Sequence, residues 1–345
     1  VSAYPIAEGY KNYASFGARV NLMDPAGLSG LDFALSYTPN KRVADNEKTH
    51  FGFKYRHWPW TVSGAYNRAD FYDFFGPTKT SRKGYSLSIQ YDNYIIPERA
   101  RSLEYTIRVT GYGDLEKLPD FQNIATSFDE FYTGTANLYY KSLRKTIGSV
   151  EHEKGITWKL VSANNLVQSR LFPRVYANLD YGFLLPIDHS SIWLRTSFGH
   201  SFGDREEPFA NFYFGGFGNN WVDHEEINRY RKFYSFPGVE LNELAGTNYG
   251  KAMLEWTLPP IRFRRLGLPV MYFNWARLSF FSSGIITNID SRRHRRKLVD
   301  LGAQMNLKIV LFSSLESTFS LGYAISAEEE MKPKEEFMIS LKILR

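Results

Sequence analysis

The stretch that decides the fold begins Phe212-Tyr-Phe-Gly-Gly216, continues through a roughly thirty-residue polar loop, and ends Lys251-Ala-Met-Leu-Glu-Trp-Thr-Leu-Pro259. In its last part, apolar residues alternate with polar ones. Alternation with a period of two is typical of a β-strand, because successive side chains point to opposite faces. The segment 217–248 breaks this pattern, so we expect a long loop between two strands.

The same alternation recurs along the whole chain, and no segment has a convincing helical period. The expected strands cover residues 16–22, 31–37, 51–55, 60–66, 85–91, 103–109, 136–140, 156–160, 175–183, 192–198, 212–214, 252–258, 278–280, 299–309, 315–323 and 337–343. We therefore predict an all-β chain of about sixteen strands. In this count Trp58-Pro59 falls among the outer loops and Gly113 to Glu130 among the inner turns, which reverses the usual rule of long outer and short inner connections.

Composition narrows the class of β-protein. The chain has 345 residues, of which 17% are aromatic, yet no window approaches the ~18 consecutive apolar residues of a membrane helix. A sandwich of this length would show linkers between domains, and a propeller would show an internal repeat. Charged residues such as Arg19, Lys54 and Arg108 on the polar face favour a wet lumen over a dry core. The sequence thus predicts one transmembrane antiparallel β-barrel domain over residues 1–345.

The net charge and the first residues of the chain say less about the fold than the strand pattern does. The formal net charge of +6 is spread along the strands, which argues against a nucleic-acid partner. The chain contains no cysteine. Residues 1–5 show no charged region followed by an apolar one. We expect either that a signal peptide has been removed or that the chain is the C-terminal part of a larger protein.

Six short motifs, weak one by one, occur in a characteristic order. They are Phe214-Gly-Gly216, Arg231-Lys-Phe233, Gly246 to Pro259, Phe280 to Gly284, Leu301-Gly-Ala303 and Leu321-Gly-Tyr-Ala324. Over residues 209–345 this order resembles the bacterial surface-antigen superfamily of sixteen-stranded outer-membrane barrels, which includes the barrel-assembly insertase and the two-partner secretion transporters. The chain departs from the pattern at Lys232, where the superfamily has glycine, at Ser282, where it has aspartate, and at its last residue, Arg345.

The resemblance implies that the long loop, the sixth outer loop, folds back into the lumen. Its Arg231, with Arg229 as the competing candidate and Phe233 beside it, would then meet an acidic side chain of the wall. Glu255 shares parity with Lys251 and so points inward. An arginine in a partly desolvated lumen needs a bidentate carboxylate. The alternative is that these arginines are solvated in an outer loop.

The resemblance also implies a bacterial outer-membrane protein that anchors or conducts, together with periplasmic domains or partners, in protein export or outer-membrane assembly. One alternative is a passive porin, in which lumen charges select solutes. Another is a structural anchor of a surface or periplasmic complex. Steady conductance would distinguish the porin from both.

Two further features bear on function. The basic run Arg292, Arg293, Arg295, Arg296 and Lys297 lies in an expected outer loop, where it contacts lipopolysaccharide phosphates or is simply solvated. His200 and Ser201 are adjacent in a strand and so point to opposite faces, which prevents direct pairing. No catalytic, metal-binding or cofactor motif appears, and we expect no enzymatic activity and no cofactor.

Overall fold

The computed structural model describes residues 1–11, 13–68, 83–115, 129–219, 222–223, 226–264, 266–268, 270–312, 314–329 and 331–343. Over these residues the chain is almost entirely β-structure, with three short 3-10 helices, η1 (Asp45–Glu47), η2 (Pro208–Ala210) and η3 (Arg229–Arg231). No helix in this part of the chain is long and apolar enough to cross a membrane.

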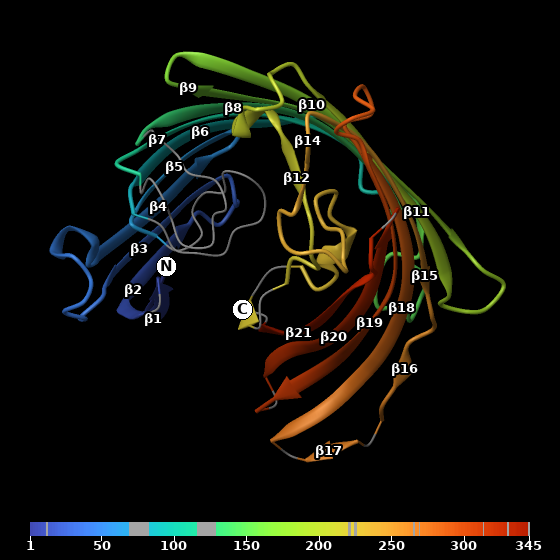
Figure 1. Ribbon diagram of the computed structural model, residues 1–345. Coiled ribbons are helices and arrows are strands. Elements are labelled where there is room, and N and C mark those ends of the chain that lie inside the picture. Colours follow the sequence, from blue (N-terminus) through green and yellow to red (C-terminus); the bar gives the residue numbers. More distant parts are fainter. Residues whose placement is uncertain are drawn as a thin grey trace.

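One strongly curved sheet encloses a central space (Figure 1). It has nineteen strands among the described residues, and three of them, β13 (Val222–Asp223), β16 (Ile261–Arg262) and β17 (Gly267–Leu268), are two residues long. The long strands are β1 (Ser2–Tyr10), β2 (Tyr13–Met23), β3 (Ser29–Tyr37), β4 (Thr49–His57), β5 (Trp60–Tyr66), β6 (Tyr85–Pro97), β7 (Ser102–Gly113), β8 (Phe131–Arg144), β9 (Lys154–Val167), β10 (Arg170–Leu184), β11 (Ser191–Ser201), β15 (Asn248–Thr257), β18 (Met271–Thr287), β19 (Arg296–Leu311), β20 (Leu315–Glu328) and β21 (Lys334–Ile343). The prediction of an antiparallel all-β sheet of about sixteen strands is confirmed.

The predicted count, however, contains two errors that cancel. Residues Ser2–Tyr10 form β1, which the alternation did not reveal. Its Pro5 argues against a central strand but is tolerated at an edge, and β1 pairs only with β2 among the described residues. Conversely, Phe212–Phe214, expected as a wall strand, is β12, which pairs with β14 (Leu244–Gly246) in a separate two-stranded sheet.

Adding β1 reverses the parity of the first half of the chain. Because consecutive wall strands are antiparallel, connections alternate between the two ends of the sheet. The strand ends that are joined by the connections 114–130, 202–247 and 288–295 share one end of the sheet, here called the loop end; residues 116–128 themselves lie outside the described residues. Trp58-Pro59, the connection 145–153 and the start of β1 share the other, the terminal end. The predicted sides of Trp58-Pro59 and of Gly113 to Glu130 were therefore wrong, and in the corrected arrangement the three longest connections, 67–84, 114–130 and 202–247, leave and rejoin the sheet at the loop end.

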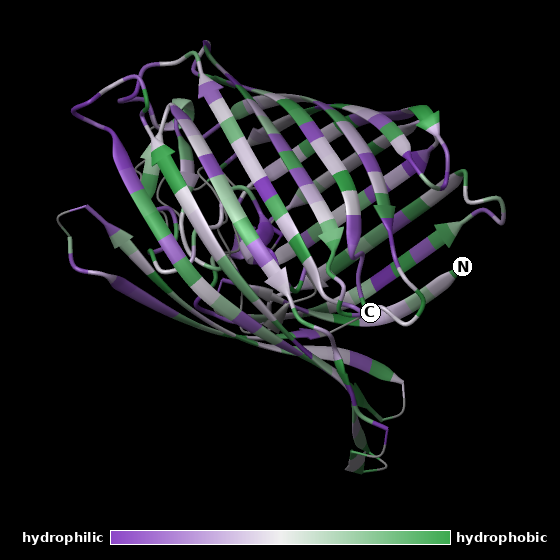
Figure 2. Ribbon diagram, turned by 90° about the vertical axis from the view of Figure 1, so that its right-hand side faces the viewer, coloured by the Kyte–Doolittle hydropathy of each residue, from purple (hydrophilic) through white to green (hydrophobic). Residues whose placement is uncertain are grey.

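The two faces of the sheet differ in polarity, and Figure 2 shows hydrophobic and hydrophilic residues alternating along the strands. In β15 the side chains of Leu254 and Trp256 are exposed on the convex face, by 56% and 41%. Lys251, Glu255 and Thr257 are buried on the concave face. An apolar outside with a polar inside is the pattern of a membrane barrel and the reverse of a soluble one.

The sheet has two edges. Among the described residues, β1 pairs with β2, and no ladder joins β1 to β21. The other edge strand, β21, pairs with β20 and, through Leu341, with Val222 of the short parallel strand β13. A segment of the long loop thus lies along the C-terminal part of the last strand.

Candidate functional site

The segment 202–247 lies inside the curve of the sheet (Figure 1), where it packs on the wall through two apolar clusters. The first cluster is formed by Phe212, Phe214, Phe236, Val239, Leu244, Tyr249, Ile285 and Leu298. In the second, Phe217 and Tyr230 pack on Met253 and Phe281, and the rings of Tyr230 and Phe281 stack with centroids 4.4 Å apart. Burying one such side chain stabilises by roughly 1.5–3 kcal/mol, so the loop is held by its own core.

A turn of this segment is also fastened to the last two strands. The backbone N–H groups of Phe217 and Gly238 donate to Oε1 and Oε2 of Glu336, at 3.0 and 2.9 Å. The hydroxyl of Ser326 donates to the carbonyl of Gly238 at 2.6 Å. Gly238 has φ +91°, and a Cβ there would lie 2.7 Å from the nitrogen of Ser326, so only glycine fits.

Arg231, at the end of η3, lies against Glu255 of β15. Its Nε is 3.0 and 3.1 Å from the two carboxylate oxygens, and its Nη2 is 2.6 Å from Oε1. The hydroxyl of Tyr230 donates to the same Oε1 at 2.7 Å. Glu255 has no exposed surface. A buried carboxylate requires this number of charge-assisted donors, because its desolvation is costly.

This contact is the centre of a larger ionic network. Arg195 of β11 joins Glu255, at 2.9 Å from Nε to Oε2, to Asp180 of β10, at 2.8 Å from Nη1 to Oδ2. On the other side, Nη1 of Arg231 lies 3.0 Å from Oε2 of Glu151, which Arg277 of β18 also contacts. Three guanidinium groups therefore alternate with three carboxylates, and each charge has an opposite neighbour.

The network lies far from where the loop enters. Glu255 is seven residues along β15 from Asn248, or about 23 Å at 3.3 Å per residue. Glu151 belongs to the connection 145–153, at the terminal end. The loop therefore enters at the loop end, and its arginine reaches a group held at the opposite end.

Glu151 is charged at neutral pH. Burial alone would raise the pKa of its carboxyl, but the charges of Arg231 and Arg277 outweigh burial and lower the pKa to about 2. Burial together with the charge of Glu255 raises the pKa of Tyr230. Tyr230 is therefore a neutral donor under all ordinary conditions.

Lys251 supplies a second fastening that does not use a carboxylate. Its Nζ donates to the backbone carbonyls of Lys232, at 3.2 Å, and of Ser235. Lys251 is buried, so these carbonyls replace its hydration shell.

The other residues expected at the lock also lie on the concave side. Phe233 stacks on Tyr176, with ring centroids 4.6 Å apart. Arg229 is buried, and its carbonyl accepts a hydrogen bond from the hydroxyl of Ser235 at 2.8 Å. Of the two arginines considered for Glu255, the structure brings Arg231 to it. Glu151, Arg195, Arg277 and Tyr230 were not expected.

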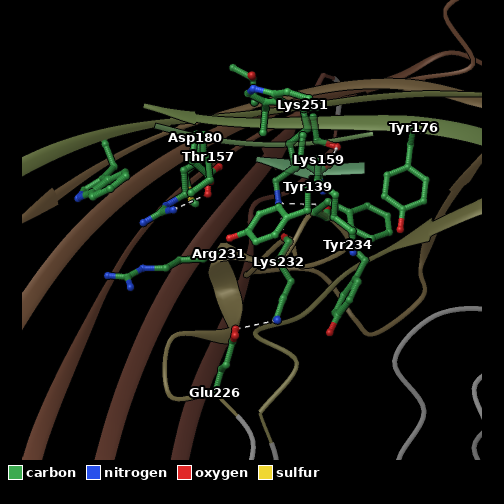
Figure 3. Close-up of a pocket in the computed structure, with 18 of the residues that line it drawn as sticks. Tyr139, Thr157, Lys159, Tyr176, Asp180, Glu226, Arg231, Lys232, Tyr234 and Lys251 are labelled. Atoms are coloured by element: carbon green, nitrogen blue, oxygen red, sulfur yellow. Dashed lines mark hydrogen bonds and ion pairs between the residues drawn. The ribbon is translucent and has the colours of Figure 1, made fainter. Parts of the chain in front are cut away.

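A cavity of about 540 Å³ remains between the loop and the wall strands β8 to β11 (Figure 3). Aromatic and charged side chains share its lining, among them Tyr139, Lys159, Tyr176 and Tyr234. Lys232 reaches into it and pairs with Glu226 at 2.7 Å. The loop thus narrows the lumen and leaves a polar space on one side.

The basic run at 292–297 does not form one surface. Arg296 pairs with Glu328, at 2.7 Å from Nε to Oε1, and Arg295 donates to the carbonyl of Ile289. Lys297 is exposed on the convex face, and Arg292 and Arg293 are exposed in the connection.

Solved structures share this fold. CdiB from Escherichia coli superposes with a TM-score of 0.54 at 11% identity over 99% of this chain. BamA from Haemophilus ducreyi, lacking POTRA domains 1–3, gives the same TM-score at 13% identity over 98%. The chain spans 61% of that CdiB chain and 69% of that BamA chain. No protein-family model matches this chain, and no curated protein sequence matches it. In fold, the chain resembles these CdiB and BamA structures.

Proposed function

We propose that this chain is a bacterial outer-membrane barrel that anchors or conducts in protein export or outer-membrane assembly, working with periplasmic domains or partners. The likeness in fold to CdiB and BamA supports a barrel in protein secretion or assembly. In this proposal residues 1–345 form the barrel domain of a larger protein, and the barrel carries no enzymatic activity of its own.

One observation carries the proposal beyond fold. The loop crosses the lumen and joins four wall elements through a charge-balanced network, Glu255 of β15, Arg195 of β11, Arg277 of β18 and Glu151 of the connection 145–153. A passive pore gains nothing from a plug that is fastened at its far end. A conduit or an anchor gains from such a plug, because the plug keeps the membrane sealed while nothing passes through the barrel.

A photo-crosslinking experiment tests the conduit. Tyr139 lines the cavity on the concave face, whereas its neighbour Tyr140 shares parity with the exposed, convex-face Tyr132. When p-benzoylphenylalanine replaces Tyr139 in cells, we expect it to crosslink to a polypeptide other than this chain. The same probe at position 140 should give only lipid adducts. If no protein adduct forms at position 139 in actively exporting cells, the chain does not act as a conduit, and the function as an anchor remains.

The porin is the alternative that the loop argues against. A porin would show large steady conductance steps and no protein adduct at either position. A purely structural anchor would be closed to ions and would co-purify with a stoichiometric partner.

A further inference from the structure

We propose that a groove on the convex face, at the loop end of β15, β18 and β19, binds an acyl chain of an outer-leaflet phosphorylated glycolipid, with its phosphate at Lys297. This inference rests on the proposed function in one respect only: the strands must span the outer membrane with the loop end outward.

The groove exists because small residues lie side by side on neighbouring strands. Ala252 of β15 is paired with Gly284 of β18, and Gly284 is paired with Val299 of β19. A Cβ built on Gly284 would meet no atom within 4 Å. One built on Gly250, the next convex-face residue of β15, would meet only Cδ1 of Ile289, at 3.8 Å. The centre of this surface is therefore empty.

Larger side chains form the walls of the groove. Phe198, Ile286 and Ile289 line the groove near the loop end, and the groove, which is open to the surroundings, has a volume of about 890 Å³. Phe198 is 59% exposed, so it stands out from the sheet. Lipid surrounds this face, and a chain entering the groove therefore gains contact with its walls rather than burial from water. Such packing favours a saturated chain but does not choose its headgroup.

The headgroup preference comes from charge. Lys297 lines the groove and is paired with Ile286, one convex-face step from Gly284 toward the loop end. In the proposed orientation its ammonium lies at the level of the outer-leaflet phosphates. Glu328, which also lines the groove, is engaged by Arg296, whereas Glu329 opposes an anion. Of the five basic residues at 292–297, Lys297 is the one that lines this groove.

Native mass spectrometry of the full folded chain in detergent tests the site, with diphosphorylated hexa-acyl lipid A, its dephosphorylated form and phosphatidylethanolamine as probes. We expect one lipid A per chain, with at least about tenfold preference over the other two. Gly284→Leu fills the groove and should weaken binding about tenfold. The matched control is Gly134→Leu, a glycine of β8 near the loop end whose Cβ would also meet nothing within 4 Å, and it should bind as the wild type does.

Charge variants separate the phosphate from the chain. Lys297→Gln should abolish the preference for diphosphorylated over dephosphorylated lipid A without abolishing one-to-one binding. Glu329→Gln should strengthen this preference. Equal binding of all three lipids by the wild type, or equal effects of Gly284→Leu and Gly134→Leu, would overturn the proposal. Each variant is first checked for heat-modifiable migration in SDS gels. If the wild type itself shows no heat-modifiable migration, the proposal of a membrane barrel is rejected, and not the proposal of the lipid groove.

Discussion

At the scale of single residues, Arg231 connects two carboxylates that come from different parts of the wall, Glu255 and Glu151. Arginine suits this place because its planar group can donate in two directions at once and stays charged when desolvated. Glu255 needs it most, since it is fully buried.

Replacing Arg231 with alanine should destabilise the folded barrel by about 2–3 kcal/mol, because a buried carboxylate loses one of its cations. The effect is smaller than for an isolated pair since Arg195 and Tyr230 remain at Glu255. The midpoint of urea unfolding in detergent measures it. Arg293→Ala, at an exposed arginine, is the control, and identical midpoints would show that the network contributes nothing.

The pH dependence follows from Glu151. Its pKa is about 2 in the folded chain against an ordinary value of 4.5. A lowered pKa means that the carboxylate stabilises the fold above about pH 4.5, and that this contribution fades as the pH falls toward 2. Glu151→Gln should therefore reduce the loss of thermal stability between pH 6 and pH 3. A variant that loses as much as the wild type over this range would refute the assignment.

How far the site could be predicted depends on which residues obey a periodicity. Glu255 was assigned to the concave face because it alternates with its neighbours in β15. Asp180 and Arg195 are directly paired between β10 and β11, and the same reasoning could have found them. Glu151 could not be found this way, since it belongs to a connection whose side chains follow no period.

At the scale of elements, the edge strand and the hairpin inside the lumen were misassigned for opposite reasons. β1 contains a proline and little alternation, yet its pairing with β2 suffices to order it. In β12 the buried Phe212 and Phe214 flank the half-buried Tyr213, as in a wall strand, but three residues cannot cross a membrane. Alternation with a period of two therefore indicates any half-buried strand, and the length of the strand decides whether it can belong to the wall.

The fastening between β15 and the loop can be tested through Lys251. Lys251→Met removes the donor to the carbonyls of Lys232 and Ser235, so the loop should leave the wall more often. Trypsin should then cleave after Lys232 several times faster than in the wild type. Lys54→Met, at an exposed lysine of β4, should not change the rate. Equal cleavage of both variants would mean that the other contacts of the loop hold it without Lys251.

At the scale of the whole molecule, the sixteen long strands pair with one another without help from the loop, and the loop narrows the space that they enclose. Phe214 and Leu244 are paired, so removing residues 217–243 would join them through Gly215-Gly216. Two glycines are suited to a tight hairpin turn, and the shortened chain should fold with an open lumen.

Conductance in a planar lipid bilayer tests whether the fastened loop seals the barrel. We expect little steady conductance from the wild type and large steady steps from the chain lacking residues 217–243. Large steady steps from the wild type, or a shortened chain that conducts no better, would show that the loop does not seal the barrel.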